Sequence, residues 1–256
     1  MAQHELSVVI DGMELNNPNH HHGYFEVDDI DGWWKAPTRK TRDEARPNAD
    51  GDFDSLDYYE ARYITIKGAF VAKGPPDRWE GADIISALLS GGPAVMMVRA
   101  DAQVQWAVVK LVEQSDAEWT APTLLEYSLQ VKAVDPRKFG ERHVFTASTG
   151  GNSVSVYQRG RYKATPILTI NGNFPGGYRI SKGGQSVSVT RALASTQTHE
   201  IDLASGILRV NGAVATGGLN DYEWNVIKPG LGQTVSITPL TTGTGNVAIE
   251  VTDTYI

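Results

Sequence analysis

The chain has 256 residues, of which 41% are hydrophobic and 21% are charged, and its formal net charge is −7. The composition is typical of a globular protein with a core, and the length allows one large or two modest domains. The acidic balance argues against a protein that tracks nucleic-acid phosphates, because that task needs clustered Lys and Arg. The lack of cysteine excludes disulfides, thiolate nucleophiles and cysteine metal sites.

No segment approaches the length of a membrane span, and the first residues lack the basic-then-apolar layout of a signal peptide. We therefore expect a soluble protein that is assembled inside a cell and does not associate with membranes.

The first predicted elements are strands. Glu5–Leu15 and Tyr24–Val27 both contain alternating apolar residues, and Tyr63–Ala72 has the most regular pattern of the three. In that last stretch the apolar face consists of Ile64, Ile66, Phe70 and Ala72. Gly68 interrupts the face, which indicates a bulge or a place where another backbone passes closely.

One segment predicts a helix, over about residues 77–90. Asp77 and Glu80 have the spacing of a capping box, and Ser90–Pro93 supplies a glycine and proline stop. The apolar side is formed by Trp79, Ala82, Ile85, Leu88 and Leu89. A helix of this length is marginal alone, so we expect it to pack on a sheet.

More strands follow the helix. Ala94–Arg99 and Val104–Val112 predict a hairpin around Ala100–Gln103, and Leu125–Ala133 predicts a strand that ends at Asp135–Arg137, where a proline stops the ladder.

Beyond residue 140 charge becomes sparse, and short β-branched runs alternate with glycine-rich turns. Predicted strands include 167–170, 187–189, 207–210, 234–237 and 247–251. The sequence thus predicts a mainly β protein with one short helix: a sheet-plus-helix domain over 1–135, a linker over 136–140 and an all-β sandwich over 141–256.

A long charged loop precedes the Tyr63–Ala72 strand. Pro37–Tyr59 has almost no aliphatic residues, and a loop of this length in a compact domain is usually functional. The adjacent Trp33 and Trp34 would face opposite sides of a strand, so one can enter the core while the other needs a cover such as a partner subunit. The candidate subunit-interface residues are Trp33, Trp34, Arg39, Arg42, Arg46, Asp50 and Asp52.

Candidate catalytic and metal sites are weak. Asp50, Asp52 and Asp54 alternate as calcium ligands do, but the glycine and glutamate of an EF-hand loop are missing. His20–His22 is a cluster of three imidazoles, of which at most two could share one ion on a strand. Nucleophile-elbow, zinc-protease and phosphate-loop motifs are absent. We expect no enzyme, no cofactor and no metal, although a pair of carboxylates held close in an apolar setting would reopen the question of catalysis.

A sugar-binding sandwich is the alternative function. Exposed aromatic residues can stack on glycans, and the candidates are Phe174, Tyr178, Tyr222 and Trp224. Large aromatic residues are mostly buried, so packing of Trp224 into the sandwich is the favoured interpretation.

Several stretches together resemble the distal tail (Dit) protein family of siphophages, especially the minor tail proteins of phages that infect actinobacteria. The resemblance extends over nearly the whole chain. It rests on the polar loop leading into Tyr63–Gly68, on Asp77–Leu89, on Ala133–Arg137, on Thr165–Gly172, on Glu200–Gly212 and on Ile227–Gly230.

The resemblance implies an N-terminal sheet-plus-helix domain, a C-terminal galectin-like β-sandwich and a structural role in the virion. Six copies would form a ring at the tail tip that connects the tail tube to the hub or baseplate and leaves a channel for DNA. The implied partners are the tail tube protein, the tail-tip hub (tail-associated) protein and the tape measure protein, with assembly in the host cytoplasm. A galectin-like fold does not itself imply sugar binding.

Charge suggests two hypotheses within that role. Arg42 and Arg46 would pair with carboxylates of the adjacent subunit, because mixed charges favour register and partner choice. The net charge would make the lumen acidic or neutral. The alternative remains a carbohydrate-binding β-sandwich that attaches to host cell-wall glycans.

Overall fold

The computed structural model describes residues 6–41, 44–50, 52–53, 58–113, 115–147 and 152–256, with only the backbone at Glu44–Ala45 and Asp52–Phe53. It divides the chain into two compact units, Met1–Lys138 with Ile256, and Phe139–Tyr255. Each unit has its own core. Part of the stretch expected as a linker is strand, because β13 begins at Lys138.

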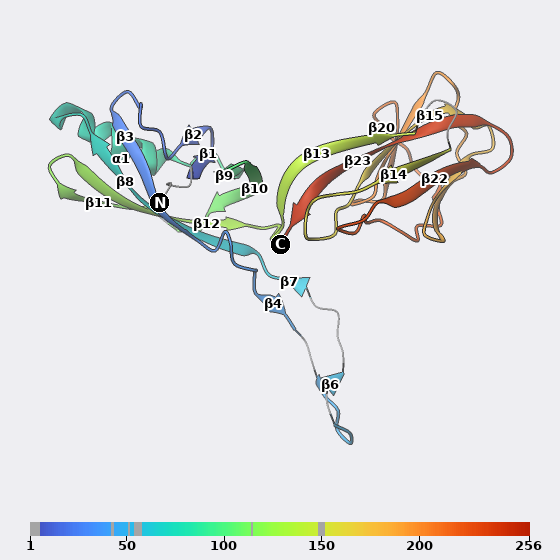
Figure 1. The fold of residues 1–256 in the computed structure, drawn as a ribbon, viewed down its shortest axis with the longest axis horizontal. Helices are drawn as coiled ribbons and strands as arrows, with labels where there is room; N and C mark the ends of the chain where they lie inside the picture. Colours follow the sequence, from blue (N-terminus) through green and yellow to red (C-terminus); the bar gives the residue numbers. More distant parts are fainter. Residues whose placement is uncertain (1–5, 42–43, 51, 54–57, 114, 148–151) are drawn as a thin grey trace. The chain divides into compact units, whose positions relative to one another are not determined.

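The first unit contains twelve strands and one α-helix among its described residues (Figure 1). They are β1 (Leu6–Ile10), β2 (Met13–Glu14), β3 (Gly23–Asp31), β4 (Arg39–Lys40), β5 (Glu44–Ala45), β6 (Asp52–Phe53), β7 (Tyr58–Tyr59), β8 (Arg62–Ala72), a 3-10 turn η1 (Pro75–Asp77), α1 (Arg78–Ala87), β9 (Ala94–Ala100), β10 (Gln103–Leu111), β11 (Asp116–Ala121) and β12 (Leu124–Ala133).

The strands of this unit are antiparallel, in the order β2-β1-β9-β10-β12-β8-β3. β12 pairs with β8 along its whole length; its other edge pairs first with β11 and then with β10. The single strand expected over Glu5–Leu15 is instead a hairpin, because Asp11 and Gly12 adopt positive φ angles of 52° and 80° and form a turn.

β8 confirms the period-two prediction. Ile64, Ile66 and Phe70 are buried in the core, whereas Tyr63 and Lys67 are exposed. Gly68 lies opposite Val27, next to a bulge in β3. A Cβ atom at Gly68 would lie 2.1 Å from the carbonyl oxygen of Glu26, so only glycine fits this close approach.

The helix lies against β8 and β12, and Ile85 is completely buried. The capping-box prediction is wrong, because the Asp77 side chain caps no helical N–H group. Its Oδ1 instead lies 3.0 Å from Nδ1 of His22. The helical pattern also placed Trp79 on the buried side of the helix, and this is wrong, because Trp79 is 63% exposed. The helix ends at Ala87, earlier than expected, and Leu89 has a φ of 62° ahead of the two glycines.

The described residues of the charged loop include two pairs of short strands. Arg39–Lys40 in β4 pairs with Tyr58–Tyr59 in β7, and β5 pairs with β6 further out. We call residues 36–61 the arm. Short strands of this kind were not expected in the loop, whose charged sequence carries no apolar alternation.

The second unit contains β13 (Lys138–Thr146), β14 (Ser153–Val156), β15 (Ile167–Asn173), β16 (Tyr178–Lys182), β17 (Gln185–Val189), β18 (Thr198–Asp202), β19 (Ile207–Val210), β20 (Ala213–Val214), β21 (Leu219–Asn220), β22 (Gln233–Pro239) and β23 (Thr244–Tyr255). One sheet has the order β13-β23-β15-β18-β19-β20 and the other β14-β22-β16-β17-β21. Both contribute to one core, for example Ile170 and Ile249 from the first and Ile180 and Val235 from the second. The unit is therefore the predicted all-β sandwich.

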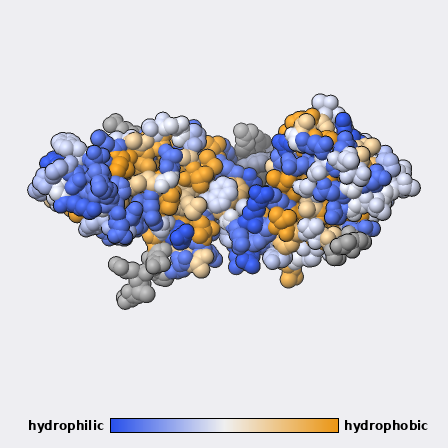
Figure 2. Space-filling view, turned by 90° about the horizontal axis from the view of Figure 1, so that it is seen from above, coloured by the Kyte–Doolittle hydropathy of each residue, from blue (hydrophilic) through white to orange (hydrophobic). Residues whose placement is uncertain are grey.

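On the face shown in Figure 2, both units mix polar and apolar residues. Such a mixture is normal for folded proteins, so it does not by itself mark an interface. Among the described residues no helix combines the length and the apolar character needed to span a bilayer.

Candidate functional site

Trp33 and Trp34 lie in the turn after β3 and not on a strand as expected, but one is buried and the other exposed, as the sequence predicts. Trp33 is fully buried in the core of the first unit, and Trp34 is 59% exposed. The pair follows β3 and precedes the arm, so Trp33 fixes the point at which the arm leaves the unit. Trp34 remains available to another surface.

A buried arginine holds this segment in place. Arg62, the first residue of β8, is 1% exposed, and its Nη1 donates to the carbonyl oxygens of Gly32 (2.8 Å), Trp33 (3.2 Å) and Lys35 (2.5 Å). Its Nε donates to Pro136 O at 3.0 Å. One guanidinium thus joins the segment before the arm, the start of β8 after it, and the segment that follows β12.

Lys138 supports the same segment from a different strand. Its Nζ donates to Trp33 O at 2.9 Å and lies 5.2 Å and 5.4 Å from the ring centroids of Trp33 and Trp34. Burial, together with the charge of Arg62, lowers the pKa of Lys138 to about 8. Burial also lowers the pKa of Arg62. The base of the arm therefore holds two cations whose direct contacts are carbonyl oxygens and aromatic rings.

Several of the described side chains of the arm are exposed to solvent. Arg39, Lys40, Arg46 and Asp50 are all exposed, and the Arg39 guanidinium lies 5.6 Å from the ring centroid of Tyr59. Arg42 lies outside the described residues, and the side chain of Asp52 is not described either. The structure thus places Trp33 at the base of the arm and the described basic residues on its exposed part.

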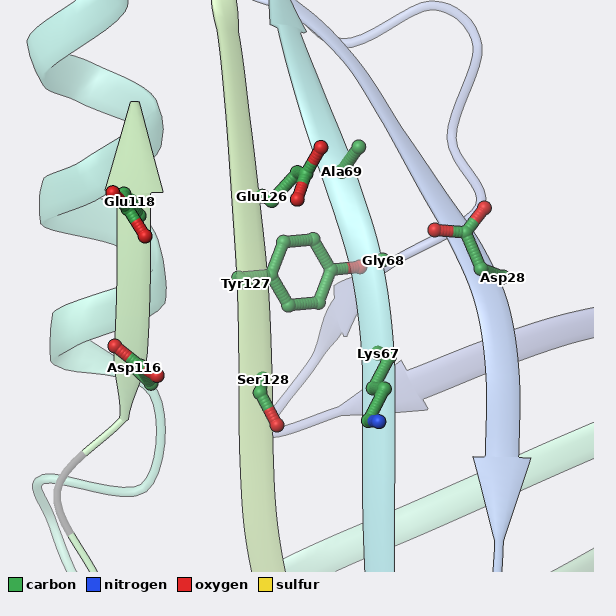
Figure 3. A pocket seen from close by; sticks show the side chains of 9 residues that line it. All are labelled: Asp28, Lys67, Gly68, Ala69, Asp116, Glu118, Glu126, Tyr127 and Ser128. Carbon is green, nitrogen blue, oxygen red and sulfur yellow. The ribbon is translucent and has the colours of Figure 1, made fainter. Parts of the chain in front are cut away.

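An acidic depression of about 330 Å³ lies on the same unit (Figure 3). Four neighbouring strands form it: Asp116 and Glu118 come from β11, Glu126 and Ser128 from β12, Lys67 from β8 and Asp28 from β3. We call this the acidic face. Glu118 and Glu126 are direct cross-strand partners, an arrangement of like charges that destabilises an isolated sheet.

Tyr127 forms the floor of the acidic face. Its hydroxyl donates to Glu26 O at 3.0 Å across Gly68. Burial raises the pKa of Tyr127, and the charges of Asp28 and Glu26 raise it further. The phenol therefore stays protonated and structural, while the carboxylates around it give the face a negative charge that favours a cationic partner.

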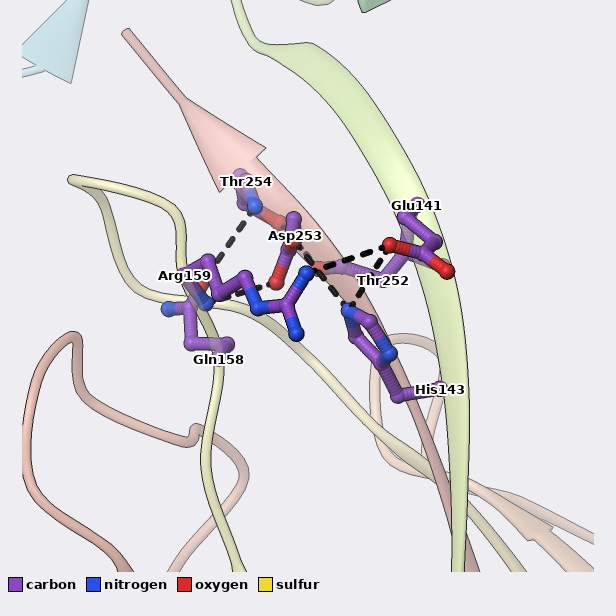
Figure 4. Close-up of polar contacts among 7 residues, drawn as sticks. All are labelled: Glu141, His143, Gln158, Arg159, Thr252, Asp253 and Thr254. Atoms are coloured by element: carbon purple, nitrogen blue, oxygen red, sulfur yellow. Dashed lines mark hydrogen bonds and ion pairs between the residues drawn. The ribbon is translucent and has the colours of Figure 1, made fainter. Parts of the chain in front are cut away.

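A second polar cluster lies in the sandwich (Figure 4). Asp253 is 3% exposed; one oxygen accepts from Arg159 N at 2.7 Å and the other lies 3.2 Å from His143 Nε2. A catalytic triad would also need a hydroxyl or thiol nucleophile bonded to the histidine. No such bond to His143 occurs among the described residues. The adjacent Gln158 accepts from Thr254 N, so the cluster attaches the loop after β14 to β23.

The aromatic candidates for sugar binding are mostly buried in the sandwich. Phe174, Tyr178 and Trp224 are at most 3% exposed, and Trp224 Nε1 donates to Ile180 O at 3.2 Å, so the prediction that Trp224 packs into the sandwich is confirmed. Tyr222 is 40% exposed and donates to Leu203 O. The described residues contain no cluster of histidines and acids suited to a metal ion.

The sequence analysis did not identify three features of the site: Arg62, Lys138 and the acidic face. Arg62 is in phase with Ile64 and Ile66, so its burial follows from the same periodicity. The acidic face was harder to find, because its carboxylates come from strands up to about one hundred residues apart.

The architecture defines a class of protein: two β-rich units, of which the first carries one helix and a charged arm and the second is a sandwich. This is the fold of SPP1 Dit (gp 19.1), described as "a Paradigm of Hub Adsorption Apparatus in Gram-positive Infecting Phages". The TM-score is 0.75 at 14% identity, over 98% of this chain and 99% of that one. The resemblance to a distal tail protein is thus confirmed at the level of the fold.

Two structures of the phage P2 baseplate in its activated conformation, with Ca and with Sr, are more distant. Their TM-scores are 0.47 and 0.46, at 6% and 8% identity, over 96% of this chain and 97% of each of those. No protein-family model and no curated protein sequence matches the chain.

Proposed function

We propose that this chain is a structural subunit of a phage tail tip, a distal tail protein. Six copies form a ring that joins the tail tube to the tail-tip hub or baseplate and leaves a channel for DNA. The observation that carries the proposal is the fold shared with SPP1 Dit over practically the full length of both chains. The role is architectural and not enzymatic, and the protein resides in the virion after assembly in the host cytoplasm.

We assign both of the surfaces that a ring requires to the first unit. A head-to-tail interface closes into a ring only if each subunit presents two complementary patches. The arm contains four basic and seven acidic residues, so only its basic side chains suit an acidic surface. Of these, Arg39, Lys40 and Arg46 are exposed, and the acidic face carries Glu118 and Glu126. We assign these three basic side chains of one copy to the acidic face of the next, with Trp34 covered at the same contact.

Opposite charges at such a contact favour correct register and partner choice more than affinity. The pairing also removes a local cost, because a neighbour's arginine would neutralise the adjacent carboxylates of Glu118 and Glu126. The ring would bind the tail tube protein and the hub protein at its two ends, and the tape measure protein inside. The net charge of −7 favours a lumen that is acidic or neutral, through which DNA slides without binding.

Charge exchange tests the contact. We expect the double variant Arg39→Glu/Arg46→Glu and the double variant Glu118→Arg/Glu126→Arg each to raise the concentration at which assembly is half-complete by at least about tenfold. The variant with all four changes should regain most of the assembly, because the charges are then exchanged between the two surfaces. Light scattering after size exclusion provides the measurement, and Lys163→Glu on the sandwich is the matched control. Unchanged assembly in both double variants would contradict the assigned contact.

The glycan-binding alternative has less support. Three of its four aromatic candidates, Phe174, Tyr178 and Trp224, are buried in the sandwich and cannot stack on a sugar without unfolding it.

A further inference from the structure

The sandwich contains a pocket of about 690 Å³ at one end of the sheet β14-β22-β16-β17-β21. The Lys182–Gln185 turn, which joins β16 to β17, forms one wall, and the segment Lys228–Thr234, which leads into β22, forms the other. The volume is in the range of pockets that bind small molecules.

Lys182 is held rigidly at the wall of this pocket. It is 8% exposed, its Nζ donates to Val226 O, and its ammonium lies 5.1 Å from the ring centroid of the buried Trp224. A weaker contact joins Nζ to Gln233 Oε1 at 3.4 Å. An ammonium has three donors, so one N–H remains for another acceptor.

Gln233 fixes the second lysine of the pocket. Its Nε2 donates to Lys228 O at 2.9 Å, and its Oε1 accepts from Lys228 N at 3.4 Å. The backbone of Lys228 is therefore held on both sides, while its side chain is exposed. The amide of Gln233 thus links the two lysines in one arrangement.

The pocket concentrates positive charge on an acidic chain. Its lining includes two lysines and no carboxylate, and neither lysine forms an ion pair among the residues that the structure describes. Burial, and then the charge of Lys228, lowers the pKa of Lys182. Two like charges without a counter-ion are a cost, and a bound anion would remove it.

The remaining lining groups indicate what the anion is attached to. Gln185 and Thr234 offer amide and hydroxyl groups suited to hydroxyls, and the 92% exposed Leu231 offers an apolar rim for a carbon chain. We infer that this pocket binds an anionic polyol, a phosphate or carboxylate carried on a hydroxylated carbon chain. The inference does not rest on the proposed tail-tip role.

Isothermal titration calorimetry on the full chain tests this inference, with glycerol 3-phosphate, glucuronate, inorganic phosphate and glycerol as probes at pH 7. We expect saturable binding of at least one of the two anionic polyols, at least about fivefold tighter than inorganic phosphate, and none of glycerol. A stronger response to glycerol 3-phosphate would assign the site to phosphates, and a stronger response to glucuronate to carboxylates.

Variants locate the binding. Lys228→Gln should weaken binding about tenfold, and Lys163→Gln, which removes one exposed positive charge elsewhere on the sandwich, should leave it unchanged. Thermal unfolding of each variant establishes that it is folded. The inference is overturned if neither anionic polyol gives a saturable signal at 10 mM, if glycerol or inorganic phosphate binds equally well, or if the two lysine variants weaken binding equally.

Discussion

At Gly68 a single hydrogen atom in place of a side chain allows three strands to meet. The Tyr127 hydroxyl reaches across this position from β12 to Glu26 O in β3, next to the β3 bulge. The sequence pattern indicated a bulge or a close backbone approach here, and the structure shows the close approach at Gly68 and the bulge in its partner strand.

Gly68→Ala should therefore lower the free energy of unfolding by about 2 to 3 kcal/mol, because its methyl group would overlap Glu26 O. Gly91→Ala is the matched control, since nothing lies within 4 Å of a Cβ atom there. Chemical denaturation measures both. Equal effects of the two substitutions would show that Gly68 is not under steric constraint.

Lys138 gives the base of the arm a pH dependence. Its pKa of about 8 in the folded protein is below the ordinary 10.5, so the charged form is disfavoured by folding. Between pH 8 and 10.5 the unfolded chain binds more protons at this residue than the folded chain, and stability must rise with pH. Below pH 8 Lys138 is charged in both the folded and the unfolded chain, so the full free-energy cost of burying its charge lowers the stability.

The free energy of unfolding of the wild type, relative to Lys138→Met, should therefore increase by up to about 3 kcal/mol as the pH rises from 7.5 to 10. The comparison with Lys138→Met cancels the titration of other groups. Denaturant unfolding at several pH values gives the difference, and a difference that stays constant or falls would contradict the assignment.

At the scale of elements, strands and hairpins with a regular local pattern could be predicted from the sequence. Contacts between residues that are distant in the sequence could not. The β8 strand and the β9–β10 hairpin follow from periodicity alone. The helix cap was wrong because His22, fifty-five residues away, contacts the carboxylate that local sequence assigned to the cap. β11 was not predicted, since most of its residues are exposed and no alternation marks it.

The candidate site shows the same division. Trp33 and Trp34 were assigned to opposite environments on the assumption of a strand. Their environments do differ, although the pair lies in the turn after β3. The acidic face depends on strand order, since β11, β12, β8 and β3 bring its charges together. Strand order is not encoded in any local window, so sequence reasoning could not place these carboxylates beside one another.

The helix contributes through one face only. Ile85→Ala should cost about 3 kcal/mol of stability, because it leaves a cavity beneath α1. Trp79→Ala should cost only about 0.5 to 1 kcal/mol, because Trp79 is largely exposed and its contact with Arg78, 5.0 Å from guanidinium to ring centroid, is a surface cation–π pair. Thermal or chemical unfolding measures the stability loss of each variant. A larger loss for Trp79→Ala than for Ile85→Ala would contradict the assignment of Ile85 to the buried face of the helix.

At the scale of the whole molecule, each unit has its own core. The first unit carries the arm and the acidic face, and the second carries a pocket lined by two lysines. The chain shares the fold of SPP1 Dit across both units. The central claim, proposed from this shared fold, is that copies of the chain assemble into a ring.

Electron microscopy of the purified protein, with its mass determined by light scattering at the same concentration, tests that claim most directly. We predict closed rings of six copies with a central opening, and a mass six times that of one chain. A protein that stays monomeric at every concentration up to 100 µM, or that forms open chains without closure, would contradict the account.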